Sequence, residues 1–175
     1  MDHHDHVRLI RDGVAGAGPN WAELGSGEGA FTLALADLLG SAGRIVSVDR
    51  DGNALNRQWR ALQDRFPTAE IEQRTADFTQ PLGLTELDGI VMANALHFVR
   101  DQPAVLTLVR GYLREAGRLI LVEYDADAGN AWVPFPISFT RWETMAGGAG
   151  FLDTRRLAAI PSRFLGSIYS AVSVR

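Results

Sequence analysis

The chain has 175 residues, of which 46% are hydrophobic and 22% charged, and its formal net charge is −4. This length predicts a single domain, 1–175, with a sizeable core, and the acidic balance argues against nucleic acid or an anionic membrane as a partner. Because the chain contains no cysteine, disulfides and thiolate metal sites are excluded. It also contains no apolar run of the length that a signal peptide or a membrane span needs, so we expect a cytoplasmic protein.

The N-terminal segment 1–19 is expected to form a short helix, over residues 4–11, followed by a linker. His3, His4 and His6 crowd the start of this segment. A buried metal site needs about four ligands held together, and the rest of the chain offers a single further histidine, so we predict no metal site. We interpret the three histidines as exposed, or as part of a lid that becomes ordered when a ligand binds.

The most informative stretch is Trp21–Phe31, in which Gly25, Gly27 and Gly29 alternate with other residues. A short apolar run ending in Glu23 comes before the glycines, and a helical pattern begins after them, which predicts a strand, a tight turn and a helix start. Glycines let a ligand approach the main chain closely, and the start of a helix presents N–H groups without partners. The turn therefore predicts a site for a cofactor with an anionic or polar end.

Strand and helix patterns alternate five times between residues 20 and 124. Apolar residues recur at helical spacing after Gly29, from Leu55 to Phe66 and from Val105 to Tyr112. Strands are expected before Gly25 and at residues 44–48, 70–75, 87–93 and 118–122. Such alternation predicts parallel βαβ units in a doubly wound α/β sheet, which binds ligands at the carboxyl ends of its strands.

The pattern changes in the segment 125–175. A loop leads to a helix expected over Ile137–Ala146, with Ser138 as its N-cap. Two strand-like runs follow, at residues 152–160 and 164–174, and they are joined only by Pro161, Ser162 and Arg163. A connection of three residues permits an antiparallel hairpin and is too short for a crossover helix. The sheet is therefore expected to end in a hairpin.

Polar residues follow the expected strands at the edge where a ligand is expected. Asp49 ends the second strand beside the glycine turn, where a carboxylate can accept both hydroxyls of a ribose. Asp77 follows the third strand and Asn94 follows the fourth. The segment 20–124 is thus predicted to bind a nucleoside-containing cofactor, although the glycines alone also fit the relaxed fingerprint of nicotinamide-binding domains.

Taken together, four stretches resemble the class I S-adenosylmethionine-dependent methyltransferases: Glu23-Leu-Gly-Ser-Gly-Glu-Gly, Val48-Asp49, Thr75-Ala-Asp77-Phe and Asp88-Gly-Ile-Val-Met-Ala-Asn94-Ala-Leu-His97-Phe. The first is similar to motif I of that family, and the last resembles the Asn/His stretch of relatives that act on small molecules. The resemblance implies a Rossmann-like, mostly parallel seven-stranded sheet in the order 3-2-1-4-5-7-6, with a C-terminal antiparallel hairpin. It also implies S-adenosylmethionine as the cofactor and S-adenosylhomocysteine as its product.

The resemblance further implies roles for individual residues. Asp77 is expected to pair with the adenine amino group, while Phe78 and Arg50 cover the two faces of its ring. The implied cofactor-binding residues are Glu23, Gly25, Ser26, Gly27, Gly29, Asp49, Arg50, Asp77, Phe78 and Asn94. On the acceptor side, the candidate catalytic residues are His97, Tyr124 and Asp125, with Trp132 and Phe135 as apolar walls.

We therefore expect methyl transfer to an oxygen, nitrogen or carbon nucleophile of a small molecule. The chain lacks the Asn-Pro-Pro-Tyr tetrad typical of enzymes that methylate nucleobases or glutamine amides. A protein or RNA methyltransferase, a non-catalytic S-adenosylmethionine-binding partner and an NAD-dependent oxidoreductase remain alternatives, and the last would need a substrate domain for which the chain has no room. The sequence leaves open whether the protein forms a homodimer.

Overall fold

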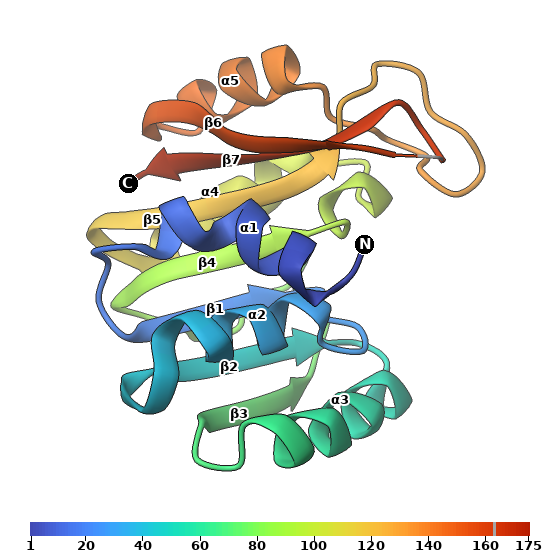
Figure 1. The fold of residues 1–175 in the computed structure, drawn as a ribbon. Helices are drawn as coiled ribbons and strands as arrows, with labels where there is room; N and C mark the ends of the chain where they lie inside the picture. Colours follow the sequence, from blue (N-terminus) through green and yellow to red (C-terminus); the bar gives the residue numbers. More distant parts are fainter. Residues whose placement is uncertain (163) are drawn as a thin grey trace.

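A computed structural model describes residues 1–162 and 164–175, and its centre is a single seven-stranded sheet (Figure 1). The strands are β1 (Asn20–Leu24), β2 (Arg44–Asp49), β3 (Glu70–Thr75), β4 (Leu87–Ala93), β5 (Leu113–Tyr124), β6 (Leu152–Pro161) and β7 (Ser167–Val174). Their order is β3-β2-β1-β4-β5-β7-β6. The pairs among β1 to β5 are parallel, whereas β7 runs antiparallel to both β5 and β6. The predicted strand order and the predicted hairpin are both confirmed.

Helices cover both faces of the sheet. One face carries α1 (His3–Val14), α2 (Ala30–Leu39) and α3 (Gly52–Arg65), and the other carries α4 (Gln102–Tyr112) and α5 (Phe139–Gly148). Two short 3₁₀ turns, η1 (Gly40–Ala42) and η2 (Leu96–Phe98), complete the described elements. All seven residues of β4 are buried, because this central strand is covered on both sides. No described helix has the length and apolar character that a bilayer crossing requires.

The alternation of strands and helices is interrupted at one place. Residues 76–86, which connect β3 to β4, contain no helix. Charged side chains therefore line one face of the edge strand β3, where Glu70 and Glu72 are exposed and alternate with half-buried Ile71 and Gln73. Charges on an edge strand also discourage pairing with another chain.

The N-terminal helix α1 is packed on the sheet. A capping box begins the helix, and Val7, Leu9 and Ile10 are buried in the core on the α2 side. His3 contacts Asp37 of α2 at 3.1 Å, and the rings of His6 and Phe31 lie 4.9 Å apart. The prediction that these histidines belong to a lid does not fit this position, since the apolar residues of α1 hold it against the sheet.

The C-terminal part follows the predicted pattern with shifted boundaries. Ser138 caps α5 as expected, by accepting the N–H of Arg141. The helix begins directly after Ser138, at Phe139, and not at Ile137 as expected. Ile137 and Trp142 are fully buried in one cluster, as a hydrophobic staple requires. The strand expected from residue 164 begins at Ser167. Arg163, expected in the connection, lies outside the described residues.

Candidate active site

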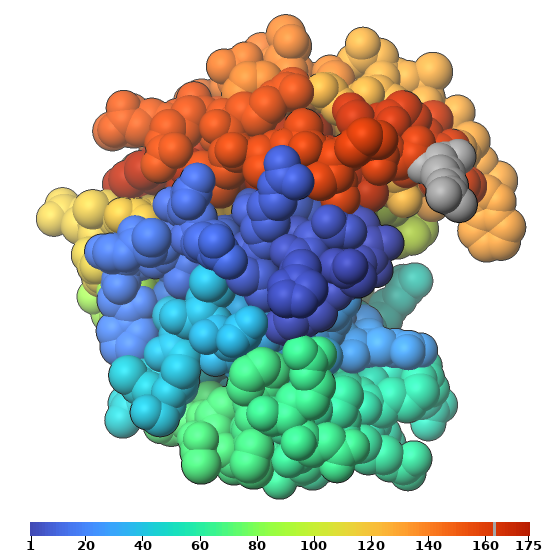
Figure 2. Space-filling model, in the orientation of Figure 1, coloured from blue at the N-terminus to red at the C-terminus, as the bar shows by residue number. Residues whose placement is uncertain are grey.

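A cavity of about 540 Å³, here called the main cavity, opens at the carboxyl edge of the sheet. Its volume lies in the range typical of small-molecule sites. In Figure 2 the molecule is hollowed at its right-hand edge, between the orange segment that follows β5 and the blue glycine turn. Seven of the ten predicted cofactor residues line the main cavity: Gly25, Gly27, Asp49, Arg50, Asp77, Phe78 and Asn94. Glu23, Ser26 and Gly29 do not line it.

The three glycines of the turn between β1 and α2 differ in what surrounds them. All have positive φ angles, of 77°, 53° and 86° for Gly25, Gly27 and Gly29. A Cβ at Gly25 would lie 2.5 Å from the Cβ of Ala95, and one at Gly29 would collide with the side chain of Gln58. A Cβ at Gly27 would meet nothing within 4 Å. Gly27 is therefore the glycine at which a ligand can approach the main chain.

We expect Gly27→Val to abolish binding of S-adenosylhomocysteine, because the branched side chain would fill the space beside the turn. Gly40→Val is a matched control, because Gly40 has a φ of 60° with nothing within 4 Å of a Cβ and lies at the end of α2, outside the main cavity. Calorimetric titration of both variants checks the prediction. Wild-type affinity in Gly27→Val would contradict the close approach, and so would equal losses of affinity in the two variants.

Asp49 connects the end of β2 to the glycine turn. Its Oδ2 accepts the N–H of Gly27 at 2.7 Å, and its Oδ1 accepts the N–H of Asp51 at 2.8 Å. An ionised carboxylate has about four acceptor positions, so two remain for hydroxyl groups of a ligand. Asp49 is thus able to hold the turn and a ribose at the same time.

Asp77 and Asn94 bring two further polar groups to the main cavity. Asp77 accepts the N–H and the hydroxyl of Thr79 through Oδ1, at 2.9 and 2.8 Å, and these hydrogen bonds keep the pKa of Asp77 below its usual value. Asn94 has a positive φ of 49°, and its buried Oδ1 has no hydrogen-bond partner among the described residues. A buried acceptor without a partner is costly, so a ligand with an N–H donor fits this position.

Glu23 lies beneath the glycine turn. It is 2% exposed, and one of its carboxyl oxygens accepts the hydroxyl of Thr32. Burial, together with the charge of Asp49, raises the pKa of Glu23 to about 8, despite the hydrogen bond from Thr32. Glu23 is therefore mostly protonated at neutral pH, and it supports the turn from below.

We expect Glu23→Gln to flatten the pH dependence of stability. The pKa of Glu23 is raised from 4.5 to about 8 on folding, so its stabilising contribution is complete below pH 4.5 and is lost as the pH rises to 8. The loss amounts to at most about 5 kcal/mol. Urea unfolding of wild type and variant between pH 5 and 9 measures the difference. Parallel pH profiles for the two proteins would show that Glu23 does not titrate in this range.

The acceptor-side candidate His97 forms a buried pair with Glu123, which we did not predict. His97 Nδ1 lies 2.6 Å from Glu123 Oε2, and the N–H of His97 donates to Oε1 at 3.2 Å. The two side chains are 3% and 0% exposed. Because a carboxylate only accepts, a neutral ring paired in this way has its hydrogen on Nδ1 and leaves Nε2 as an acceptor. This is the arrangement of a general base held in orientation by a carboxylate.

Tyr124 and Asp125 have different surroundings. The ring of Tyr124 lies 6.0 Å from that of His97, and burial with the nearby Glu123 raises the pKa of Tyr124, so its phenol keeps its proton at neutral pH. Asp125 accepts the N–H of Phe139 at 2.9 Å and a guanidinium N–H of Arg156 at 2.8 Å. One Asp125 oxygen is thus bonded to the start of α5 and the other to Arg156. The structure does not bring Asp125 to His97.

Of the two predicted apolar walls, Phe135 lies beside His97, because its N–H donates to the carbonyl oxygen of His97 at 3.0 Å. Trp132 is 74% exposed, and the Phe135 ring lies 5.5 Å from the guanidinium of Arg100. Phe98 lines the main cavity, and the centre of its ring lies 4.3 Å from the centre of the His97 ring. Phe164 lies 5.8 Å from the ring of Tyr124. Phe98 and Phe164 are 58% and 49% exposed, so they offer apolar surface beside His97 and Tyr124 respectively.

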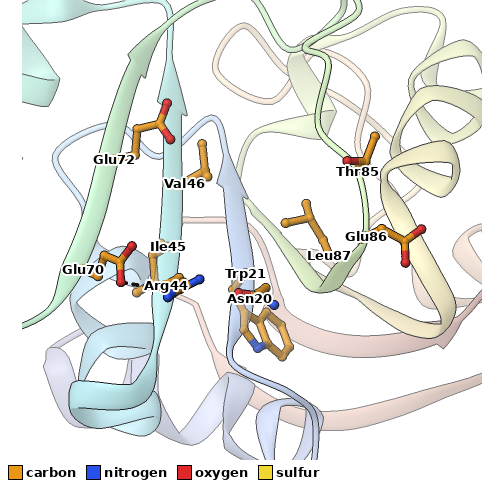
Figure 3. A pocket seen from close by; sticks show the side chains of 10 residues that line it. All are labelled: Asn20, Trp21, Arg44, Ile45, Val46, Glu70, Glu72, Thr85, Glu86 and Leu87. Atoms are coloured by element: carbon orange, nitrogen blue, oxygen red, sulfur yellow. Dashed lines mark hydrogen bonds and ion pairs between the residues drawn. The ribbon is translucent and has the colours of Figure 1, made fainter.

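A second hollow, of about 310 Å³, lies at the opposite edge, where β1 to β4 begin (Figure 3). Its lining includes Trp21, Val46 and Leu87, and Arg44 there pairs with Glu70 at 3.0 Å. None of the predicted site residues lines it. In parallel sheets ligands bind at the carboxyl ends of the strands, so we place the site at the main cavity.

Comparisons with known proteins identify the family of the chain. A family model described as "Methyltransferase domain" matches residues 17–149. The reducing polyketide synthase grgA of a Penicillium species is 26% identical over an alignment of 155 residues. The match covers 74% of this chain and 6% of that protein. The magnesium protoporphyrin IX methyltransferase ChlM of Synechocystis PCC 6803, solved with bound S-adenosylmethionine, has a TM-score of 0.72 and 19% identity, over 98% of this chain and 76% of that one.

The carbon methyltransferase CurJ has a TM-score of 0.75 and 18% identity, over 91% of this chain and 49% of that one. The chain thus spans about half of CurJ and a small part of the synthase. The likeness to ChlM and CurJ shows the fold. The family model matches three quarters of the chain, including the glycine turn and the ends of β2 to β5. It confirms the predicted methyltransferase class. The chain belongs to the methyltransferase domain family.

Proposed function

We propose that this domain transfers the methyl group of S-adenosylmethionine to a small molecule that arrives protonated, and that His97 accepts the proton. The observation that carries this proposal is the buried pair of His97 and Glu123 beside the main cavity. The cofactor supplies a methyl group on a positively charged sulfur, which is already a reactive electrophile. The protein therefore has to align the acceptor, exclude water and, for a protonated acceptor, provide a base.

The main cavity supplies groups suited to the cofactor. Asp49 is proposed to accept the ribose hydroxyls, and Asn94 Oδ1 to accept an N–H of the cofactor's amino group. Phe78 and Arg50 are proposed to cover the adenine ring, with Asp77 at its amino group. Glu23, Ser26 and Gly29 are proposed to act from beneath, by holding the turn in shape.

His97 and Glu123 are proposed to act as a unit. The Nδ1–H of His97 is bound to Glu123, so Nε2 is the atom that takes the proton, and the carboxylate of Glu123 stabilises the imidazolium that forms. Only 3% of the His97 side chain is exposed, and the ring of Phe98 lies against it. Since Phe98 is itself 58% exposed, rotation of its side chain is the change that would admit an acceptor to Nε2.

The acceptor atom is proposed to be a carbon next to a carbonyl group. A polyketide synthase and a carbon methyltransferase are among the similar proteins, and a carbon acid needs a base before it can react. The C–H proton would pass to His97 Nε2, and the electron pair left on the carbon would form the bond to the methyl group. The bond between methyl and sulfur would break at the same time, and its electron pair would stay on the sulfur of S-adenosylhomocysteine. The exposed aromatic rings of Phe98 and Phe164 suit an acceptor that is partly apolar.

The test has two parts. In the first, β-keto thioesters are incubated with the protein in D₂O without cofactor. In the second, cofactor is added, and catechols and primary amines are offered as alternative acceptors. We expect the wild type to exchange the acidic C–H for deuterium and, with cofactor, to methylate that carbon. His97→Gln should lose the exchange. Methylation of the catechol oxygen or the amine nitrogen, or of a macromolecule alone, would contradict the carbon acceptor.

Other features of the account remain predictions from the sequence. These are a cytoplasmic location and the division into a segment 1–19, a cofactor-binding core 20–124 and an acceptor-side segment 125–175, while the oligomeric state is left open by the sequence.

A further inference from the structure

A buried polar network beneath the glycine turn centres on Gln58 of α3. Gln58 is fully buried and lies outside the main cavity. Its Oε1 accepts the hydroxyl of Ser47 at 2.9 Å and an amide N–H of Gln73 at 2.6 Å. Its Nε2 donates to the hydroxyl oxygen of Thr32 at 3.1 Å. One side chain thus ties together β2, β3 and α2.

The same network reaches the glycine turn at three points. The side chain of Gln58 occupies the space that a Cβ at Gly29 would fill. The Ser47 and Ser26 hydroxyl oxygens lie 2.8 Å apart, and Thr32 donates to Glu23. Because the single hydrogen of Ser47 is used on Gln58, the hydroxyl of Ser26 is the donor to Ser47. The direction of each hydrogen bond therefore follows from the amide orientation of Gln58.

We propose that Gln58 is a positioning residue for the cofactor: it holds Ser26, Gly29 and Glu23 so that the turn fits the ligand before the ligand arrives. This proposal rests on the proposed binding of S-adenosylmethionine at the main cavity. It extends the site to a helix that contributes no residue to the cavity wall. An apolar side chain at Gln58 would remove one buried hydrogen-bond partner from each of Ser47, Gln73 and Thr32, and the turn would relax.

Gln102 provides a matched control on the opposite face of the sheet. It is also fully buried, donates to the carbonyl oxygen of Phe135 at 2.9 Å and accepts from Arg141 at 3.2 Å. It lies on α4 and contacts no residue of the glycine turn through these hydrogen bonds. Methionine and glutamine side chains are similar in size, and either substitution removes one buried amide group. Both variants should therefore lose similar stability.

The experiment compares Gln58→Met with Gln102→Met in the full chain. We expect Gln58→Met to bind S-adenosylhomocysteine about 10-fold or more weakly by calorimetry, and Gln102→Met to stay within about twofold of the wild type at a similar melting temperature. Amide hydrogen exchange of the free proteins gives a second readout. The amides of residues 25–29 should exchange faster in Gln58→Met and unchanged in Gln102→Met.

Ser47→Ala provides a smaller change that decides the question if Gln58→Met does not fold. It removes only the connection from Gln58 to Ser26, and Ser170→Ala is its control, because Ser170 is a buried strand serine whose Oγ has no partner among the described residues. We expect S-adenosylhomocysteine to bind Ser47→Ala several-fold more weakly and Ser170→Ala as it binds the wild type. If the wild type binds and Ser47→Ala or a folded Gln58→Met binds equally well, Gln58 is only structural. If the wild type does not bind, the proposed function fails with it.

Discussion

Replacing His97 with alanine is expected to lower kcat by about 100-fold or more while the affinity for S-adenosylhomocysteine stays near that of the wild type. The reason is that His97 lies outside the wall of the main cavity and is held by Glu123, with Nε2 left as the acceptor. The measurement is turnover on an identified acceptor, together with calorimetry. His4→Ala, which removes an exposed histidine of α1, serves as the control.

Glu123→Gln extends the same test to the partner of His97. A glutamine can present an N–H to Nδ1, which favours the tautomer with the hydrogen on Nε2 and so removes the base. We therefore expect a loss of kcat comparable to that of His97→Ala. Normal turnover in both variants would mean that the enzyme works by aligning its substrates, without a base.

Asp49→Ala is expected to weaken binding of S-adenosylhomocysteine by roughly 10- to 150-fold, as hydrogen bonds to a charged group contribute about 1.5–3 kcal/mol. The substitution removes an acceptor for the ribose and also the partner of the Gly27 N–H. Asp51→Ala is the matched control. Asp51 caps α3 through the N–H of Asn53 and does not line the main cavity, so its loss should lower the melting temperature and leave affinity unchanged. Unchanged affinity in a folded Asp49→Ala protein would place the ribose elsewhere.

The features of the fold that could be predicted from the sequence are those that repeat along the chain. Apolar runs and turn residues predicted the five parallel strands, and a three-residue connection predicted the terminal hairpin. No helical pattern was found between the third and fourth strands, and residues 76–86 contain no helix in the structure. The lid expected over residues 1–19 depended on where α1 packs, which is a tertiary property.

Within the site, residues whose environment is set by neighbours in sequence were placed correctly at the main cavity. Asp49 and Asp77 follow strands directly, and the turn needs glycine at each alternate position. The spacing of the glycines could not separate Gly27, which faces open space, from Gly29, which packs on Gln58. That difference depends on α3, which lies more than twenty residues further along the chain.

The acceptor side was harder to predict, because its contacts cross the sheet. Glu123 lies 26 residues after His97, and the two meet only because β5 pairs with β4, whose end leads into η2. A signal was present: Glu123 is a carboxylate directly after the apolar run Leu119–Val122. The hydrogen bond from the first N–H of α5 to Asp125 could not be predicted, because the position of α5 cannot be inferred from neighbouring residues.

Titration of the purified protein with S-adenosylhomocysteine, NAD and NADP tests the central claim most directly. The account predicts that S-adenosylhomocysteine binds at one site per chain and raises the melting temperature, while the dinucleotides do neither. Asp49→Ala and Gly27→Val should weaken or abolish that binding. Tight binding of NAD or NADP, with no response to S-adenosylhomocysteine, would contradict the account.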